Sequence, residues 1–127
     1  MMGTRSGDID AGAVSFIMEK EGLDANGISN LLNKKSGVLG IFGESSDMRD
    51  LENAVAAGNP KAVLAEEMYF YRIKKYVGAY AAALGGVDII RVYGRCGENQ
   101  CNCRSEVWRR SRIHGCQGRP GKEQGPW

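Results

Sequence analysis

The sequence has no long apolar run, since no uninterrupted stretch approaches the roughly 20 residues that a membrane-spanning helix needs. The start, Met1 to Arg5, is followed by no signal-peptide core. We therefore expect neither a membrane protein nor a secreted one, and predict a cytoplasmic location. With 127 residues, 43% of them apolar and 25% charged, the chain has the composition of a soluble globular protein.

Cysteine, tryptophan and histidine are absent from residues 1–90 and all fall later. The charge changes at the same point: residues 1–90 carry 9 Lys or Arg against 12 Asp or Glu, a net −3, and residues 91–127 carry 8 against 3, a net +5. The four cysteines are spaced C-x4-C-x-C-x12-C around His114, which matches no paired C-x2-C zinc framework. The tail arginines would suit nucleic acid, but no recognition module precedes them. Neither a zinc site nor binding of nucleic acid by the tail is therefore favoured.

Apolar residues at helical spacing predict four helices. Asp10 would cap the first, over residues 13–21, and Gly37 would follow the second, over residues 27–35. Met48, Leu51 and Val55 predict the apolar face of a third helix, which ends near Gly58.

Asn59-Pro60 is a cap followed by proline at the first helical position, and it predicts a long helix to about Leu84. Its apolar residues predict a largely buried helix with its tyrosines packed in the core. Residues 38–43 are expected to be a short strand or an extended connector, and residues 87–90 the start of a buried strand. One buried strand cannot form a sheet, so the pattern suggests an excerpt of a larger α/β domain.

The junction before the third helix is the first candidate site. Ser45, Ser46 and Asp47 each carry an oxygen able to cap the helix, and Arg49 adds a guanidinium at its mouth. Two readings are open: an ordinary helix start, or amides that bind an anionic ligand. Arg5, flanked by glycines, is either a phosphate-binding group or a solvated loop charge.

Four blocks of residues 1–90 resemble acetate kinases in order and spacing. They are Met2-Gly3-Thr4-Arg5-Ser6-Gly7-Asp8, Leu32-Asn33-Lys34-Lys35-Ser36-Gly37, Ser45-Ser46-Asp47-Met48-Arg49-Asp50 and Lys75-Tyr76-Val77-Gly78-Ala79-Tyr80. The resemblance implies a partial RNase-H-like α/β domain of the actin, sugar-kinase and heat-shock-protein superfamily, helix-rich in this part. It covers the C-terminal-domain portion of a family member.

Residue by residue, the resemblance implies that Arg5 stabilises the transition state of phosphoryl transfer. It places Asp47, Met48 and Arg49 in the segment that holds the adenine nucleotide. Gly97, Glu98 and Asn99 fall at the end of a second nucleotide loop.

The sequence departs from the family near that second loop. Arg95 stands where the family has a glycine, and Cys96 where it has an aliphatic residue. Codons chosen from those permissible for residues 108–126, when read one nucleotide later, can give a sequence that resembles the family's next segment. We therefore divide the chain into a partial nucleotide-binding domain, residues 1–107, and an aberrant disordered tail, residues 108–127, produced by a frameshift.

The resemblance implies transfer of a phosphoryl group between ATP and acetate, giving acetyl phosphate and ADP, with Mg²⁺ whose ligand lies outside this chain. It also implies a homodimer. We expect the isolated chain to be inactive, because most of the site lies elsewhere. Three alternatives stay open: a propionate or butyrate kinase relative, a non-catalytic nucleotide-binding fragment, and a nucleic-acid-binding protein driven by its basic tail.

Overall fold

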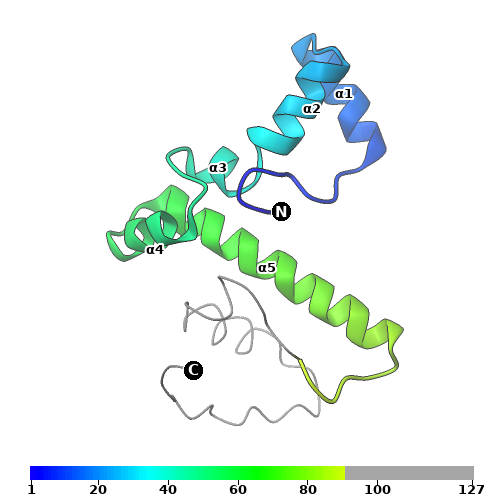
Figure 1. Cartoon of the computed structure of the whole chain (residues 1–127), viewed down its shortest axis with the longest axis vertical. Helices are drawn as coiled ribbons and strands as arrows, with labels where there is room; N and C mark the ends of the chain where they lie inside the picture. Colours follow the sequence, from blue (N-terminus) through cyan, green and yellow to red (C-terminus); the bar gives the residue numbers. More distant parts are fainter. Residues whose placement is uncertain (91–127) are drawn as a thin grey trace, which may run out of the picture. The chain divides into compact units, whose positions relative to one another are not determined.

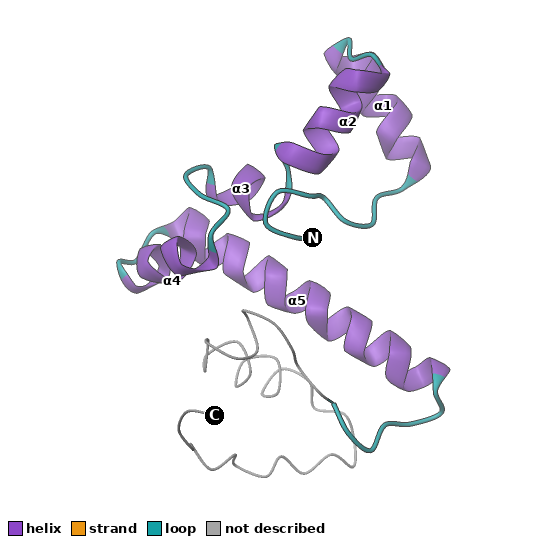
Figure 2. Cartoon of the chain, viewed as in Figure 1, coloured by secondary structure: helices purple, strands orange, loops and turns teal. Residues whose placement is uncertain are grey.

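The computed structural model describes residues 1–90, which are helix-rich and contain no strand (Figures 1 and 2). The helices are α1 (Ala11–Glu21), α2 (Ala25–Lys34), α3 (Gly37–Phe42), α4 (Met48–Ala56) and α5 (Pro60–Ala83). The chain divides into a first unit, Met1–Arg72, and a second, Ile73–Trp127, described as far as residue 90. In the described part, no helix has the length and apolar character needed to cross a membrane.

Short polar side chains cap the starts of α1, α2 and α5, and Asp47 does the same for α4. Asp10, Asp24 and Asn59 each accept a hydrogen bond from a first-turn amide of the helix that follows, at 2.7–2.9 Å. These bonds satisfy amides that have no partner inside the helix. The predicted caps Asp10 and Asn59 are confirmed. Asp24 was not predicted, and α1 and α2 each begin two residues earlier than expected.

The prediction of a strand or extended connector over residues 38–43 is wrong, because Gly37–Phe42 forms helix α3. Val38 and Phe42, one helical turn apart, are both buried. The apolar spacing of this segment therefore fits a helix as well as a strand. Its glycines, which have low helix propensity, made a helix look unfavourable from the sequence.

A distant segment supplies the cap of α3. Ser36 precedes the helix but makes no side-chain capping bond. Instead, the amides of Val38 and Leu39 donate to the carbonyl oxygens of Met2 and Gly3, each at 2.9 Å. Two first-turn amides are thereby satisfied, so the short helix depends on the N-terminal loop.

The core of the first unit lies among α3, α4 and the beginning of α5. Its buried residues are Val38, Phe42, Leu51, Ala62 and Ala65. Met48, Val55 and Tyr69 are partly buried and pack against this cluster. The predicted apolar face of α4 is therefore confirmed.

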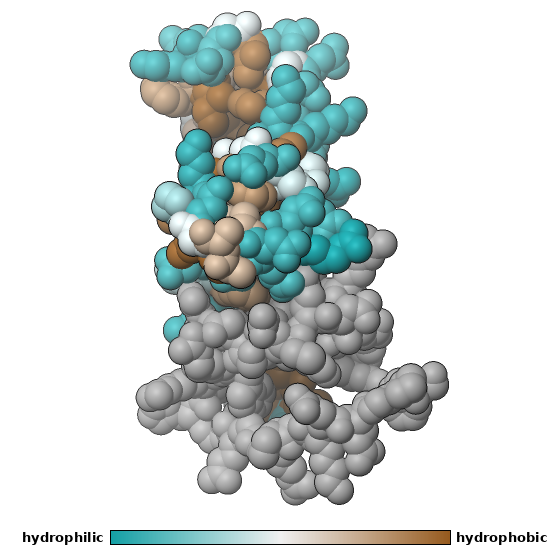
Figure 3. Space-filling view, turned by 90° about the vertical axis from the view of Figure 1, so that its left-hand side faces the viewer, coloured by the Kyte–Doolittle hydropathy of each residue, from teal (hydrophilic) through white to brown (hydrophobic). Residues whose placement is uncertain are grey.

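The apolar stripe predicted for α1, Val14, Ile17 and Met18, is partly buried. No residue of α1 is fully buried, and Phe16, which lies outside this stripe, is exposed. In α2 the stripe is buried at Ile28. Apolar side chains accordingly reach the surface of the first unit among hydrophilic ones (Figure 3).

The expectation that α5 is largely buried is also wrong. Its buried residues are Ala62, Ala65 and Phe70. Tyr71 and Tyr80 are exposed, Tyr80 to 65%, although the sequence placed both in the core. Helical spacing shows that these residues share a face, but burial also requires a partner surface.

Residues 87–90, expected to begin a buried strand, are not a strand, and Ile89 is 81% exposed. A strand is stabilised by backbone hydrogen bonds to a neighbouring strand. Since residues 1–90 contain no other strand, they offer no such neighbour.

The core makes a first prediction about stability. Leu51→Ala should lower the free energy of unfolding by about 3 kcal/mol, because it removes a fully buried side chain and leaves a cavity. Leu64→Ala, at a position 51% exposed on α5, should cost about 1 kcal/mol or less. Urea denaturation followed by far-UV circular dichroism would measure both. Equal losses would contradict the described core.

Candidate functional site

Arg5 lies in an N-terminal loop, residues 2–8, here called the Arg5 loop. Its backbone is fixed to the corner between α2 and α3, residues 32–39. Besides the two bonds that cap α3, three hydrogen bonds make this attachment: Ser36 N to Thr4 O (3.0 Å), Ser6 N to Leu32 O (2.9 Å) and Thr4 Oγ1 to Asn33 O (3.0 Å). The backbone is thus held on both sides of Arg5, while the side chain of Arg5 is exposed.

An ion pair holds the far end of the Arg5 loop. Asp8 Oδ2 lies 3.0 Å from Arg72 Nη2, and three quarters of the Arg72 side chain is buried. A partly buried guanidinium is stabilised by a carboxylate partner. The pair therefore ties the loop to α5 as well as to the α2–α3 corner.

The Arg5 loop also lies against the residues that lead into α4. At Gly3, an added Cβ would be 3.2 Å from the carbonyl oxygen of Ser46. The structure therefore brings together the backbones of two predicted site segments that are some forty residues apart in sequence, the loop of Arg5 and the start of the helix that carries Arg49.

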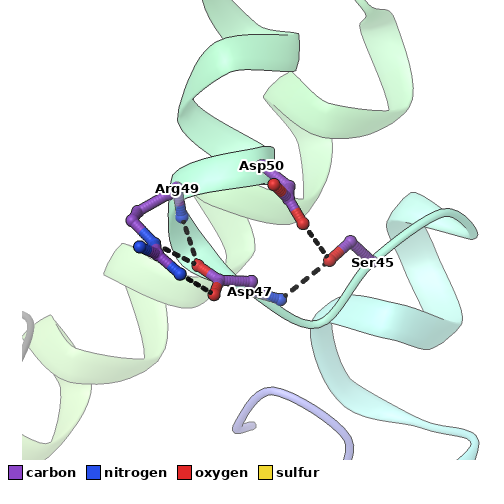
Figure 4. Close-up of polar contacts among 4 residues, drawn as sticks. All are labelled: Ser45, Asp47, Arg49 and Asp50. Atoms are coloured by element: carbon purple, nitrogen blue, oxygen red, sulfur yellow. Dashed lines mark hydrogen bonds and ion pairs between the residues drawn. The ribbon is translucent and has the colours of Figure 1, made fainter.

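The start of α4 forms a hydrogen-bonded network of its own side chains (Figure 4). Asp47 is the N-cap, and its Oδ1 accepts from Arg49 N at 2.9 Å. The Arg49 guanidinium binds the same carboxylate through Nε (3.2 Å) and Nη2 (2.8 Å). Ser45 Oγ accepts from Asp47 N at 3.0 Å and donates to Asp50 Oδ2 at 2.6 Å.

This network supports the helix-cap reading over a preformed anion site. The amides of Asp47 and Arg49 already donate to protein oxygens. Hydrogen bonding by Asp47, and then its negative charge, raises the pKa of Arg49 above its ordinary value, so Arg49 stays charged at physiological pH. With Asp50 beside it, the group carries two carboxylates against one guanidinium. A phosphate would have to displace Asp47 from Arg49.

The predicted site residues differ in accessibility. The Arg49 side chain is 77% exposed, so solvent weakens its ion pair with Asp47 and leaves it free to exchange partners. Met48 is partly buried against the core. Its side chain therefore anchors the start of α4.

The other predicted site residues lie outside the described part of the chain. These are Gly97, Glu98 and Asn99, with the departures Arg95 and Cys96, the cysteines with His114, and the whole tail after residue 107. Within residues 1–90, no cluster of three or more His, Cys, Asp or Glu side chains could hold a metal ion.

Sequence reasoning missed three residues that shape the Arg5 loop. Asp8 and Arg72 form its ion pair, and Gly37 lies under its backbone. A positive charge in an amphipathic helix gives no sign of a partner 64 residues away. Gly37 was predicted as the end of a helix, and its position after Ser36 gave no sign of a tertiary contact.

The cap of α4 can be tested by a pair of variants. Asp47→Ala should lower the free energy of unfolding by about 1 kcal/mol, because Arg49 N loses its acceptor. Asp47→Asn keeps an oxygen at the same place and should cost much less, although it removes the charge. Urea denaturation would compare the two. Equal losses would mean that the charge of Asp47, and not its capping bond, stabilises α4.

Comparison with known proteins gives concordant results. The sequence profile of the Acetokinase family matches residues 1–124. The acetate kinase of Phocaeicola vulgatus is 82% identical over 107 residues, which are 84% of this chain and 27% of that protein. The acetate kinase of Bacteroides thetaiotaomicron is 76% identical over the same coverage.

Solved structures agree. The crystal structure of Porphyromonas gingivalis acetate kinase has a TM-score of 0.81 at 63% identity, covering 84% of this chain and 27% of that one. A propionate kinase from Francisella tularensis has a TM-score of 0.80 at 38% identity, covering 86% and 28%. The chain thus spans about a quarter of the length of these relatives. The chain therefore belongs to the acetate kinase (acetokinase) family.

Proposed function

We propose that residues 1–107 are part of the C-terminal nucleotide-binding domain of an acetate kinase, with an RNase-H-like α/β fold in the complete protein. The whole enzyme would transfer a phosphoryl group between ATP and acetate. The observation that carries this proposal is the contact between the Arg5 loop and the residues before α4. It joins the two segments to which the family resemblance gives the transition-state arginine and the nucleotide.

Phosphoryl transfer from ATP to acetate requires a positively charged group held in a fixed position. A carboxylate oxygen of acetate forms a bond to the γ-phosphorus of ATP, and the bond from that phosphorus to the oxygen of ADP breaks. Negative charge spreads over the oxygens of the transferring group, and a fixed guanidinium stabilises it. Arg5 supplies this guanidinium in our proposal. Its backbone is held at both sides, so little ordering is needed before reaction.

In the same proposal, Asp47, Met48 and Arg49 form one wall of the nucleotide site, and Gly97, Glu98 and Asn99 belong to the other. Met48 anchors the wall in the core, while Arg49 would exchange Asp47 for the nucleotide. ATP or ADP is thus the expected ligand. Mg²⁺ would screen the phosphates, but residues 1–90 hold no cluster of side chains suited to a metal ion.

The remaining parts of the proposal are a cytoplasmic location, a homodimer and a frameshifted tail over residues 108–127. The last two follow from the resemblance. The alignments with curated relatives cover 107 residues, the same number as in the proposed domain. The family profile extends further, to residue 124, so resequencing the locus is the direct test of the frameshift.

A propionate kinase is the second candidate, because a protein of that name is among the structural neighbours. The two activities share the phosphoryl-transfer step and differ in the acyl group. No described residue is assigned to an acyl pocket. The ratio of kcat/KM for acetate to that for propionate, measured on a complete protein expressed from the locus, would decide between them.

The proposed role of Arg5 can be tested in a chimera. It is the P. vulgatus acetate kinase with its 107 aligned residues replaced by those of this chain. The chimera should form acetyl phosphate from ATP and acetate, and Arg5→Ala should lower kcat by about 1,000-fold with a smaller change in KM for ATP. Lys20→Ala, an exposed cation on α1, should leave turnover unchanged. The isolated chain should have no turnover. Full activity after Arg5→Ala would reject the assigned role.

Nucleotide binding can be tested on the chain itself by isothermal titration with ADP. Binding should be detectable, and Arg49→Ala should weaken it about tenfold, because a charge-assisted hydrogen bond to the nucleotide is lost. Lys20→Ala is the matched control. If both variants bind ADP like the original chain, Arg49 does not contribute to the site.

A further inference from the structure

Gly37 occupies the tightest backbone contact of the Arg5 loop. It lies at the α2–α3 corner with φ +65°, in the left-handed region. A Cβ added there would overlap the carbonyl oxygen of Met2 and would lie 2.8 Å from that of Arg5 and 3.1 Å from Arg5 N. All three neighbours are backbone atoms, which cannot rotate away as a side chain can.

The loop cannot withdraw from such a Cβ without breaking its attachment. Met2 O, the atom closest to it, accepts the hydrogen bond from Val38 N at 2.9 Å. Arg5 O accepts from Met2 N at 3.0 Å and closes the turn that presents Arg5. Any side chain at position 37 would therefore displace the turn and uncap α3.

Other glycines separate the effect of contact from that of backbone conformation. Gly43, at the opposite end of α3, has φ +88°, and Gly58, after α4, has φ +79°. An added Cβ at either would have no neighbour within 4 Å. A side chain at these two positions would therefore strain φ alone, whereas at Gly37 it would also push on the Arg5 loop.

We propose that Gly37 is a positioning residue for Arg5: the absence of a side chain at position 37 lets the turn of residues 2–5 seat on the α2–α3 corner and sets the direction from which the guanidinium reaches the transferring phosphoryl group. This inference rests on the proposed function of Arg5. It adds a residue that touches neither substrate nor nucleotide. Small displacements of a reacting group can lower a rate about 100-fold, so the effect is measurable.

The experiment compares Gly37→Ala with Gly43→Ala in the P. vulgatus chimera. Both introduce alanine at positive φ, but the first alone meets the Arg5 loop. Gly37→Ala should lower kcat about 100-fold with KM for ATP changed less than threefold. Gly43→Ala should keep kcat within about threefold of the unmodified chimera, after correction for the folded fraction measured by thermal denaturation. Equal losses of kcat in the two variants would overturn the proposal.

A double-mutant cycle separates positioning from general damage. If Gly37 acts through Arg5, Gly37→Ala should add less than about a twofold loss of kcat to a chimera that already carries Arg5→Ala. If Gly37→Ala only reduces the amount of active protein, the two losses should multiply. Multiplied losses would therefore overturn the proposal.

Thr4→Val provides a gentler variant in case Gly37→Ala does not fold. It removes the hydrogen bond from Thr4 Oγ1 to Asn33 O and leaves the backbone contact at Gly37 intact. A lower kcat with an unchanged KM for ATP would support the positioning of Arg5 by the corner. An unchanged kcat in Thr4→Val, together with an unfolded Gly37→Ala, would overturn it.

The failures of the two proposals are distinguishable. An inactive unmodified chimera, or one in which Arg5→Ala is fully active, would reject the proposed function and the role of Gly37 with it. A chimera that is active and depends on Arg5, but in which Gly37→Ala behaves like Gly43→Ala, would reject the role of Gly37 alone.

Discussion

Backbone hydrogen bonds between the Arg5 loop and the α2–α3 corner are the interaction on which the first unit depends. They do two things at once. The carbonyls of Met2 and Gly3 cap α3, which has no side-chain cap, and α3 carries Val38 and Phe42 into the core. The same bonds fix the loop beside Ser46. Loss of the corner would therefore affect both packing and the candidate site, which is why control variants are needed to separate them.

The start of α4 follows a different principle, because its polar groups satisfy one another. Ser45, Asp47, Arg49 and Asp50 exchange hydrogen bonds within a few residues, as Figure 4 shows. Such a network stabilises the helix start without a ligand. In this network the guanidinium of Arg49 already donates hydrogen bonds to Asp47. A nucleotide would compete with Asp47, and because this ion pair is largely exposed, the exchange would cost little.

Local rules predicted much of this fold, and tertiary contacts account for what they missed. Asp10, Asn59 and the stripe of Met48, Leu51 and Val55 act within one or two helical turns, so sequence spacing reveals them. Helix α3 and the exposure of α5 depend on atoms distant in sequence, which spacing cannot show. For the site, residue types and the family resemblance selected Arg5 and the Asp47–Arg49 segment, and the structure places Gly3 of the Arg5 loop beside Ser46, which precedes that segment. The role of Gly37 was not predicted, because it depends on a left-handed φ and on contacts with loop atoms that form only in the folded chain.

The two arginines of the candidate site are therefore prepared to different degrees. Arg5 projects from a backbone held at the α2–α3 corner and, through Asp8, at Arg72, so its origin is fixed while its guanidinium is exposed. The guanidinium of Arg49 is bound to the carboxylate of Asp47 and must leave it before it can bind a nucleotide. Stabilisation of a transition state is strongest when the charged group needs no reorganisation at the moment of reaction. Nucleotide binding tolerates an exchange of partners, because it precedes the chemical step. The held loop thus suits the role proposed for Arg5 on the transferring group, and the exchangeable pair suits the role proposed for Arg49 at the nucleotide.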